Sequence, residues 1–258
     1  MLVYTFDRTL DGVLSAVFDA YFRHQLPDEL VAEGAVLPMF CDEEYRVVTT
    51  EEKSRRVWAG LEKRLKPEVL RLLTVSWLSE EPELYTPLFH YIYKVFDSRV
   101  GGGYNFTDPD VLYVTNTARR VMHEQLRMKQ FIRFQKAKDG TYLAVVAPDN
   151  DVLPLITDHF SDRFGDQPWL IYDARRHYGY YYDRQTVTRI TFEDEAAVPF
   201  SLDDGRLDEV LLSDNDRLMQ DLWRTYFKAI CIRERMNPRK QLNDMPRRYW
   251  KYMTEKQA

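Results

Sequence analysis

The sequence predicts an α+β fold: a helical N-terminal half, a mainly antiparallel sheet of about five strands in the middle, and C-terminal helices. Apolar residues recur at helical spacing through most of the first 128 positions, whereas alternating runs rich in β-branched and aromatic residues gather between 131 and 192. Because the strands cluster and do not alternate with helices, a doubly wound sheet is disfavoured. We expect one domain over residues 1–258, with a helical part to about 128 and a sheet-containing part from about 129.

The N-terminal half opens with a short strand at 2–6. Thr9 is expected to cap a helix with apolar residues from Leu10 to Phe22, in which Gly12 marks a close approach. Residues 28–50 are irregular apart from a short strand at 45–48. The remaining helical patterns lie at 57–65, at 67–77 with Pro67 in the first turn, at 85–96 before Gly101–Gly103, and from Asp108-Pro109 towards Met128.

The second half begins with a hairpin. The runs FIRFQKA and TYLAVVA flank a Lys-Asp-Gly turn. A helix is expected at 150–164, and Ser213 starts another with an apolar face, which Asn237-Pro238 ends. Three more strands are predicted in PWLIYD, HYGYYYD and TVTRITFED, and a last helix follows Pro246.

Composition excludes several classes of protein. The chain has 258 residues and a net charge of −5, and its apolar runs are too short for a membrane span. The start, MLVYTFDRTLDG, has no signal-peptide pattern. Two distant cysteines, Cys41 and Cys231, indicate a reducing compartment and cannot hold an iron–sulfur cluster alone. We therefore expect a cytoplasmic protein with no membrane association.

No motif for a nucleotide, a metal or a nucleophilic serine is present. The chain lacks a P-loop, HExxH, GxSxG and a Rossmann fingerprint, and GGGY at 101–104 is typical of a loop between helices. Its five histidines show no HxxxH or HxH spacing. We therefore expect no metal site and no cofactor.

Positive charge gathers in two stretches of this acidic chain. Residues 119–138 carry seven cations and one acid, and residues 233–258 carry eight cations and three acids. A solvated face is the usual interpretation of such a charge run, but one glutamate cannot pair seven cations, so contact with phosphates is an equal alternative. In the tail, Tyr249, Trp250 and Met253 would share one helix side and dock it. The candidate phosphate contacts are Arg119, Arg120, Arg127, Lys129, Arg133, Arg176, Arg247, Arg248 and Lys251.

Two further segments carry residues suited to chemistry. In HFSDRF, His159 shares a helix face with Asp162 and Arg163, as an acid–base group beside an anion clamp would; a half-buried histidine at a helix end is the simpler interpretation. In DARRHYGYYYD, Asp173 and Arg175 or Arg176 precede a strand whose Tyr178, Tyr180 and Tyr182 share a face, which suits base stacking or ordinary sheet packing.

Long stretches of the chain also resemble one bacterial family. MPRRYWKYMTEK, NPRKQ, RMKQFIRFQKAKDG, DHFSDRFGDQPWLIYDARR and the opening YTFDRTLDGVLSAVFDAY are similar to the "probable DNA metabolism protein" family, a domain of unknown function. The family is encoded beside a radical-SAM protein of presumed DNA modification or repair, and some members are fused to a uracil-DNA-glycosylase-like domain. This chain resembles the stand-alone form and carries the motifs of neither enzyme. The resemblance implies a companion of these two proteins.

Three functional hypotheses follow. The first is a nucleic-acid-binding accessory protein in DNA repair or modification, whose basic groove contacts phosphates. The second is an enzyme acting on nucleotides or DNA ends through His159, Asp162, Arg163, Asp173 and Arg175. The third is a protein-interaction subunit of a radical-SAM repair system whose basic patch docks an acidic partner. The first hypothesis requires that the two basic stretches meet in the fold, and the second requires that the catalytic groups do.

Overall fold

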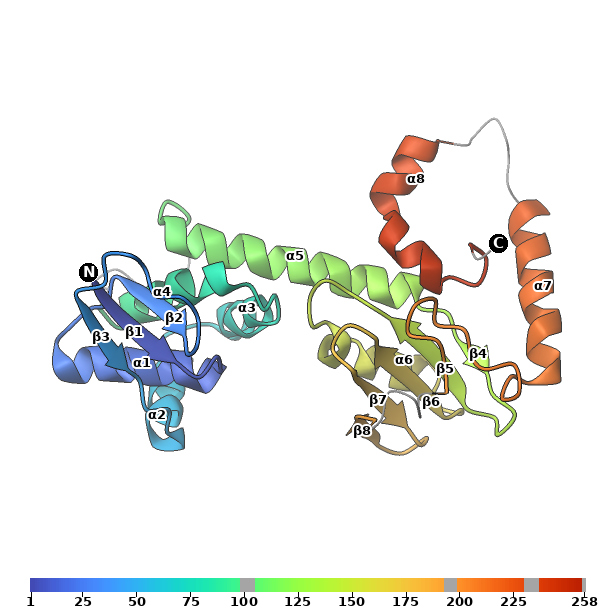
Figure 1. Cartoon of the computed structure of the whole chain (residues 1–258), viewed down its shortest axis with the longest axis horizontal. Helices are drawn as coiled ribbons and strands as arrows, with labels where there is room; N and C mark the ends of the chain where they lie inside the picture. The colour runs from blue at the N-terminus through green and yellow to red at the C-terminus, as the bar shows by residue number, and fades with distance from the viewer. Residues whose placement is uncertain (98–104, 193–198, 230–236, 257–258) are drawn as a thin grey trace. The chain divides into compact units, whose positions relative to one another are not determined.

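The computed structural model describes residues 1–97, 105–192, 199–229 and 237–256 (Figure 1). The chain divides into two compact units, Met1–Met122 and His123–Ala258. The predicted class is confirmed: helices dominate the first part, a five-stranded sheet forms the middle, and helices follow it. The predicted loop at Gly101–Gly103, and Arg233 and Arg235 of the second basic stretch, lie outside the described residues.

The first unit contains a parallel sheet that the sequence predicted only in part. The central strand β1 (Leu2–Phe6) was expected, but β2 (Glu29–Ala32) falls in a segment predicted to be irregular. Strand β3 (Glu43–Arg46) begins two residues before the predicted one. The order is β2-β1-β3, with both outer strands parallel to β1. Because parallel pairing joins distant segments, such short strands carry a weak local signal.

Helices α1 (Leu10–Arg23) and α4 (Tyr85–Asp97) pack against the apolar face of this sheet. Helix α2 (Glu51–Glu62) packs against α1 and α4, and α3 (Pro67–Trp77) and the 3₁₀ turn η1 (Pro82–Leu84) complete the helical layer. Thr9 caps α1 by accepting a hydrogen bond from Gly12 N, as predicted. A Cβ at Gly12 would lie 2.3 Å from Asp7 Oδ1, which confirms the expected close approach. Tyr4 and Phe6 of β1 and Leu30 and Ala32 of β2 belong to this core, and the Phe6 ring meets that of Tyr85.

The second unit is built on the predicted five-stranded sheet, in the order β4-β5-β6-β7-β8. Three of its four strand pairs are antiparallel, and β5 and β6 are parallel. Gly140 closes the expected hairpin with φ +91°, and Gly140 N donates to Ala137 O. The strands are β4 (Gln135–Lys136), β5 (Tyr142–Val146), β6 (Trp169–Asp173), β7 (Tyr178–Tyr182) and β8 (Val187–Ile190).

The crossover between β5 and β6 differs from the predicted helix at 150–164. It consists of a 3₁₀ turn, η2 (Leu153–Leu155), followed by the short helix α6 (Thr157–Arg163). Pro154 has no backbone N–H to donate, and it disfavours a helical conformation in the residue before it. A single helix over residues 150–164 therefore does not form. The rings of Phe160, Phe134 and Trp169 meet on this side of the sheet. The opposite face packs against residues 200–212 and Tyr252.

Helix α5 (Pro109–Phe131) begins in the first unit and ends in the second, three residues beyond the predicted Met128. Asp108 Oδ1 accepts a hydrogen bond from Asp110 N, as a capping residue does. No helix among the described residues is long and apolar enough to cross a membrane. Helix α7 (Asp214–Ala229) follows Ser213 as predicted, yet Leu218 and Leu222 on its expected apolar face are exposed.

The C-terminal segment is docked, but not as the single helix expected after Pro246. It forms the short helix α8 (Pro238–Asp244), capped by Asn237, and the 3₁₀ helix η5 (Arg247–Tyr252). Tyr249, Tyr252 and Met253 are buried, and Tyr252 Oη donates to Leu202 O at 3.2 Å. Trp250, expected to be an anchor, is only half-buried, and its indole N–H donates to Met245 O within the segment itself.

This difference predicts unequal effects of two substitutions. Tyr252→Ala is expected to lower the free energy of unfolding by about 3–5 kcal/mol, because it removes a buried ring from the face of the sheet. Trp250→Ala is expected to cost less, since its ring is partly exposed and its hydrogen bond is local. Chemical denaturation of the two variants beside the parent chain checks the order. Equal losses would show that Trp250 is the anchor after all.

Candidate nucleic-acid interface

The predicted meeting of the two basic stretches is confirmed for residues 123–138 and 237–256, which both belong to the second unit. Arg127 Nη2 donates to Asn243 O at 3.4 Å, and Arg133 Nη2 lies 2.8 Å from Glu255 Oε1. The rings of Phe131 and Tyr249 also pack, with centroids 6.0 Å apart. The end of α5 therefore forms the surface on which the C-terminal segment rests.

The candidate phosphate-contacting residues differ in the partners of their side chains and in their exposure to solvent. Three guanidinium groups pair with buried carboxylates: Arg133 with Glu255, Arg176 with Asp173, and Arg248 with Glu124. In the first unit, Arg119 donates to Asn116 Oδ1, and Arg120 pairs with Glu81. The remaining candidates lie on the second unit, where Arg247 and Lys251 are exposed and Arg127 and Lys129 are half-exposed.

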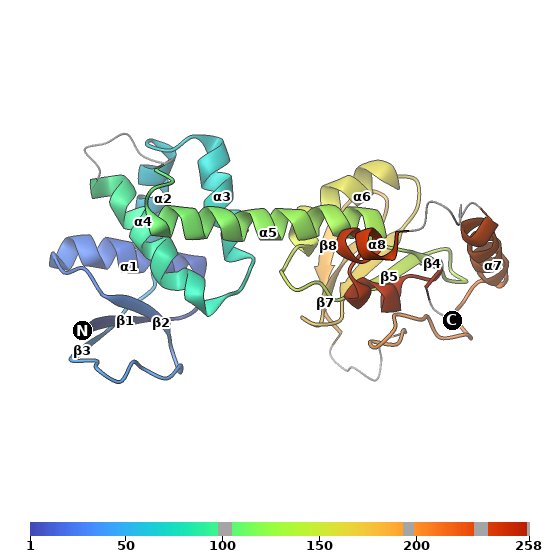
Figure 2. The ribbon, with the colours of Figure 1, turned by 90° about the horizontal axis from the view of Figure 1, so that it is seen from above.

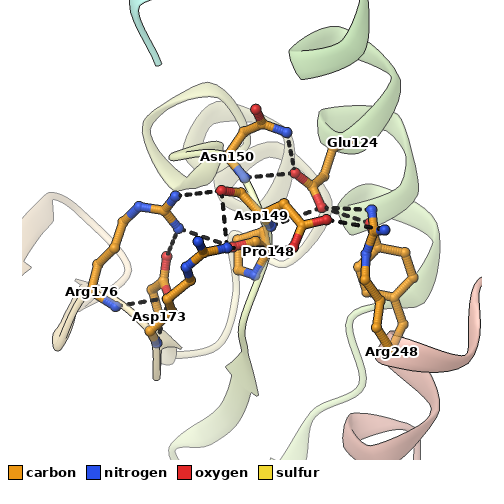
Figure 3. Close-up of polar contacts among 9 residues, drawn as sticks. Glu124, Pro148, Asp149, Asn150, Asp173, Arg176 and Arg248 are labelled. Carbon is orange, nitrogen blue, oxygen red and sulfur yellow. Dashed lines mark hydrogen bonds and ion pairs between the residues drawn. The ribbon is translucent and has the colours of Figure 1, made fainter. Parts of the chain in front are cut away.

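Glu124 is the buried anchor of the C-terminal segment (Figure 3). Its side chain is only 2% exposed, although α5 carries cations before and after it. Oε1 accepts from Tyr249 Oη at 2.6 Å and from Arg248 Nη2 at 3.3 Å. The carboxylate also accepts from the backbone N–H groups of Asp149 and Asn150, at 3.0 and 2.8 Å. One acid thus ties the segment to the loop that follows β5.

These hydrogen bonds set the ionisation of Glu124. Burial alone would raise the pKa of the carboxyl, but the hydroxyl of Tyr249 and the backbone N–H groups of Asp149 and Asn150 outweigh it and hold the pKa below the ordinary 4.5. Burial, together with the carboxylate of Glu124, in turn raises the pKa of Tyr249. The pair is therefore a carboxylate and a neutral phenol at neutral pH.

A second buried pair stands at the end of β6. Asp173 is fully buried and accepts from Arg176 Nη1 at 2.9 Å and from the backbone N–H of Arg175. Burial raises the pKa of its carboxyl, against the opposing effect of the Arg176 guanidinium. Arg176 also donates to the carbonyl oxygens of Pro148 and Asp149 (Figure 3). Because β5 and β6 are parallel, this pair holds together the loops at their carboxyl ends.

Three arginines from two distant segments meet at Asp149. Arg248 Nη1 lies 3.0 Å from Asp149 Oδ2 and Arg175 Nη1 lies 3.4 Å from Oδ1, while Arg176 binds the carbonyl. Carboxyl ends of parallel strands are common ligand sites. Here, however, each guanidinium faces a carboxylate of the chain, so the local charges are balanced. The geometry is that of a rigid support and not of an open anion site.

The five candidate catalytic residues fall into two clusters. Asp173 and Arg175 belong to the pairs around Asp149, whereas His159, Asp162 and Arg163 lie together on α6. Among the described residues, no hydrogen bond or ion pair joins His159 to Asp173 or Arg175. Burial, and the cations Lys129 and Arg163, lower the pKa of His159. A neutral half-exposed imidazole at a helix end is what these surroundings support.

The tyrosines of β7 are mostly used in packing. Tyr182 is buried and stacks on Trp169, with centroids 5.4 Å apart. Tyr178 is buried, and its hydroxyl donates to Asp151 Oδ1. Tyr180 is half-buried, which leaves it as the member of this face whose ring partly meets solvent. In the described part of the chain, no group of three histidine, cysteine or acidic side chains could hold a metal ion.

The comparison with protein families decides the affiliation. A family model described as a domain of unknown function, DUF4130, matches residues 82–255, more than half of the chain. The chain belongs to this family. Neither the curated proteins nor the solved structures gave a match. The DUF4130 region includes α5, the five-stranded sheet and the docked segment, and therefore every residue of the Glu124 and Asp173 pairs.

Sequence reasoning missed the roles of Glu124, Asp149 and Asp151 in this DUF4130 chain. Their partners lie 25 to 125 residues away, so no local pattern reveals them. One signal was present: residues 119–138 carry seven cations and a single acid, Glu124. A lone acid in a basic helix is a candidate for burial, since a solvated helix would more commonly pair several charges.

The lowered pKa of Glu124 predicts an acid-labile unit. A carboxyl whose pKa is lower in the folded state stabilises the fold above its ordinary value, and this contribution is lost as the pH falls through the folded-state pKa. We therefore expect the contribution of Glu124 to fade below about pH 4.5. Denaturant unfolding at several pH values should show the stability gap between the parent chain and Glu124→Gln narrowing below that pH. A gap independent of pH would contradict this assignment.

Proposed function

We propose that the protein is a nucleic-acid-binding accessory protein whose second unit contacts phosphates. The observation that carries this is the docking of residues 237–256 on the end of α5, which brings two basic stretches onto one compact unit. Arg239, Arg247 and Lys251 are exposed there, with Arg127 and Lys129 half-exposed. Phosphate contacts from such cations fix position and carry no base information, so binding is expected to tolerate any sequence.

Buried ion pairs support the proposal indirectly. The buried carboxylates of Glu124 and Glu255 pair with Arg248 and Arg133, one cation from each of the two basic stretches. These pairs fix the backbone of the docked segment, so cations on either side of them are presented from an ordered support. Ordering before binding lowers the entropic cost of association. In this proposal Arg133, Arg176 and Arg248 position the surface, and other cations touch phosphate.

The family resemblance gives the proposal its setting. Members of the resembled family are encoded beside a radical-SAM protein, and some are fused to a uracil-DNA-glycosylase-like domain, which suggests that this chain helps such enzymes engage DNA in the cytoplasm. The protein would supply affinity for the strand, and its companions would supply the chemistry.

Fluorescence anisotropy with labelled single- and double-stranded DNA tests the proposal. The triple variant Arg239→Gln, Arg247→Gln and Lys251→Gln is expected to bind both at least tenfold more weakly at low salt, because three phosphate contacts are lost. The matched control removes three exposed cations of the first unit, Lys63, Lys66 and Arg71, in the same way and is expected to bind like the parent chain.

Equal losses of DNA affinity in the two triple variants would show that net charge alone governs binding, and would contradict a defined binding surface. Arg248 is left unchanged in this design, because its substitution would also disturb the buried Glu124. Melting curves of both variants control for folding.

A further inference from the structure

One face of the three-stranded sheet in the first unit is covered only in part. Figure 2 shows α1 on one side of β1, β2 and β3 and the segment that joins β2 to β3 on the other. Parallel sheets are ordinarily covered on both faces by helices. In the described part of the first unit, the second face has this connecting segment in place of a helix. Val3 and Thr5 of the central strand are buried on this face, whereas Glu44 and Arg46 of the outer strand β3 are exposed.

The connecting segment exposes large apolar side chains. Val36 is 95% exposed, Met39 91% and Phe40 79%. Three neighbouring residues of this type are costly in water, and exposed apolar groups with a polar rim mark interaction sites. Beside them the sheet face is hollowed by a cavity of about 360 Å³, lined by Thr5, Glu33, Leu37, Glu44 and Arg46 among others. The surface thus offers both protruding anchors and a recess.

The rim of this surface is acidic. Residues 28–46 hold six acids, namely Asp28, Glu29, Glu33, Asp42, Glu43 and Glu44, against one cation, Arg46. Arg46 pairs with Glu33, the N-terminal amine with Asp42, and Arg23 of α1 with Glu43, so part of this charge is balanced. Of the six acids, Asp28, Glu29 and Glu44 stand beyond these three pairs. Such a rim repels phosphate, which sets this surface apart from the basic one on the second unit.

We propose that this acidic surface, residues 28–46 with Thr5, docks a partner protein through a segment that carries an apolar anchor flanked by Lys or Arg. The apolar residues supply the central contact, and the acids select cations at its rim, as in complementary protein interfaces. The inference goes beyond the proposed function: the second unit would hold nucleic acid while the first recruits a protein. Both nucleic acid and an anionic lipid surface are disfavoured as occupants, since the rim repels them.

Selection from a phage library of random 12-residue peptides against the immobilised full-length chain tests this. We expect enriched peptides to combine Phe, Trp or Leu with at least two Lys or Arg. A synthetic peptide from the selection is expected to bind at least tenfold more weakly to the variant Val36→Ser, Met39→Ser and Phe40→Ser. Binding should also weaken with salt and in the variant Glu29→Gln with Glu44→Gln, whose two positions share the face of Val3 and Thr5 and therefore isolate the contribution of the rim.

Three results would overturn the proposal. They are enriched peptides that bind the serine variant equally well, self-association of the parent chain that the serine variant abolishes, and binding of phosphatidylcholine vesicles that depends on Phe40. The substituted positions are exposed, and a melting curve verifies that the variant is folded. Because the serine variant keeps every cation of the second unit, its DNA binding is expected to equal that of the parent chain. Failure here therefore leaves the phosphate-binding proposal standing.

Discussion

Replacing Glu124 with alanine is expected to lower the free energy of unfolding of the second unit by about 3 kcal/mol, because donors left without an acceptor inside a protein cost about 1–3 kcal/mol each. The carboxylate accepts hydrogen bonds from Tyr249, Arg248 and the N–H groups of the loop after β5. Its removal deprives the Tyr249 hydroxyl and the N–H groups of Asp149 and Asn150 of this acceptor, whereas the exposed Arg248 keeps its pair with Asp149. Urea denaturation followed by circular dichroism measures the loss.

The control for this prediction is His123→Ala, an exposed neighbour on the same helix, which is expected to change stability by less than about 0.5 kcal/mol. Tyr249→Phe alone and combined with Glu124→Ala completes a double-mutant cycle. The two changes should be far from additive, because they remove the same hydrogen bond. Additive losses would show that Glu124 does not hold the segment.

A chain that ends at Met245 is expected to lose at least about 5 kcal/mol, since it lacks three buried side chains whose single truncations cost about 2–5 kcal/mol each. These are Tyr249, Tyr252 and Met253. The shortened chain also leaves Arg133 without Glu255, and Glu124 without Arg248. The second unit, and not only its C-terminal segment, should therefore become less stable.

Hydrogen-exchange mass spectrometry locates this effect. Peptides covering β5 and the end of α5 should exchange faster in the shortened chain, because both contact the missing segment. Peptides covering β1 and α1 belong to the first unit and are expected to exchange as in the full chain. Unchanged protection in β5 would mean that the segment is an appendage, and the account of its docking would be wrong.

Local sequence patterns predicted most elements because their causes are local. Thr9 caps α1, Gly140 turns the hairpin, and apolar spacing places α4 and α5. Strand β2 escaped prediction, since its four residues, ELVA, are defined by pairing with β1 and by no alternation of their own. The helix expected at 150–164 is interrupted at Pro154. This proline was visible in the sequence, but the helical spacing of the apolar residues was given more weight in the prediction.

The candidate interface was predictable in outline and not in detail. Charge counts alone predicted that residues 119–138 and 233–258 act together, and the described parts of both that lie in the second unit are in contact. The sequence did not show which arginines pair with a carboxylate of the chain. Arg248 and Arg133 meet carboxylates more than 120 residues away, and only the fold brings these partners together.

The most direct test of the central proposal is the salt dependence of DNA binding by the full chain. The proposal assigns phosphate contacts to five cations of the second unit, so the log–log slope for duplex DNA is expected to reach about −4.5, at about −0.9 per contact. The Arg239, Arg247 and Lys251 triple variant should reduce its magnitude by about 2 to 3. No detectable binding of either DNA form at low salt, or a slope unchanged in the variant, would contradict a phosphate-contacting surface on this unit.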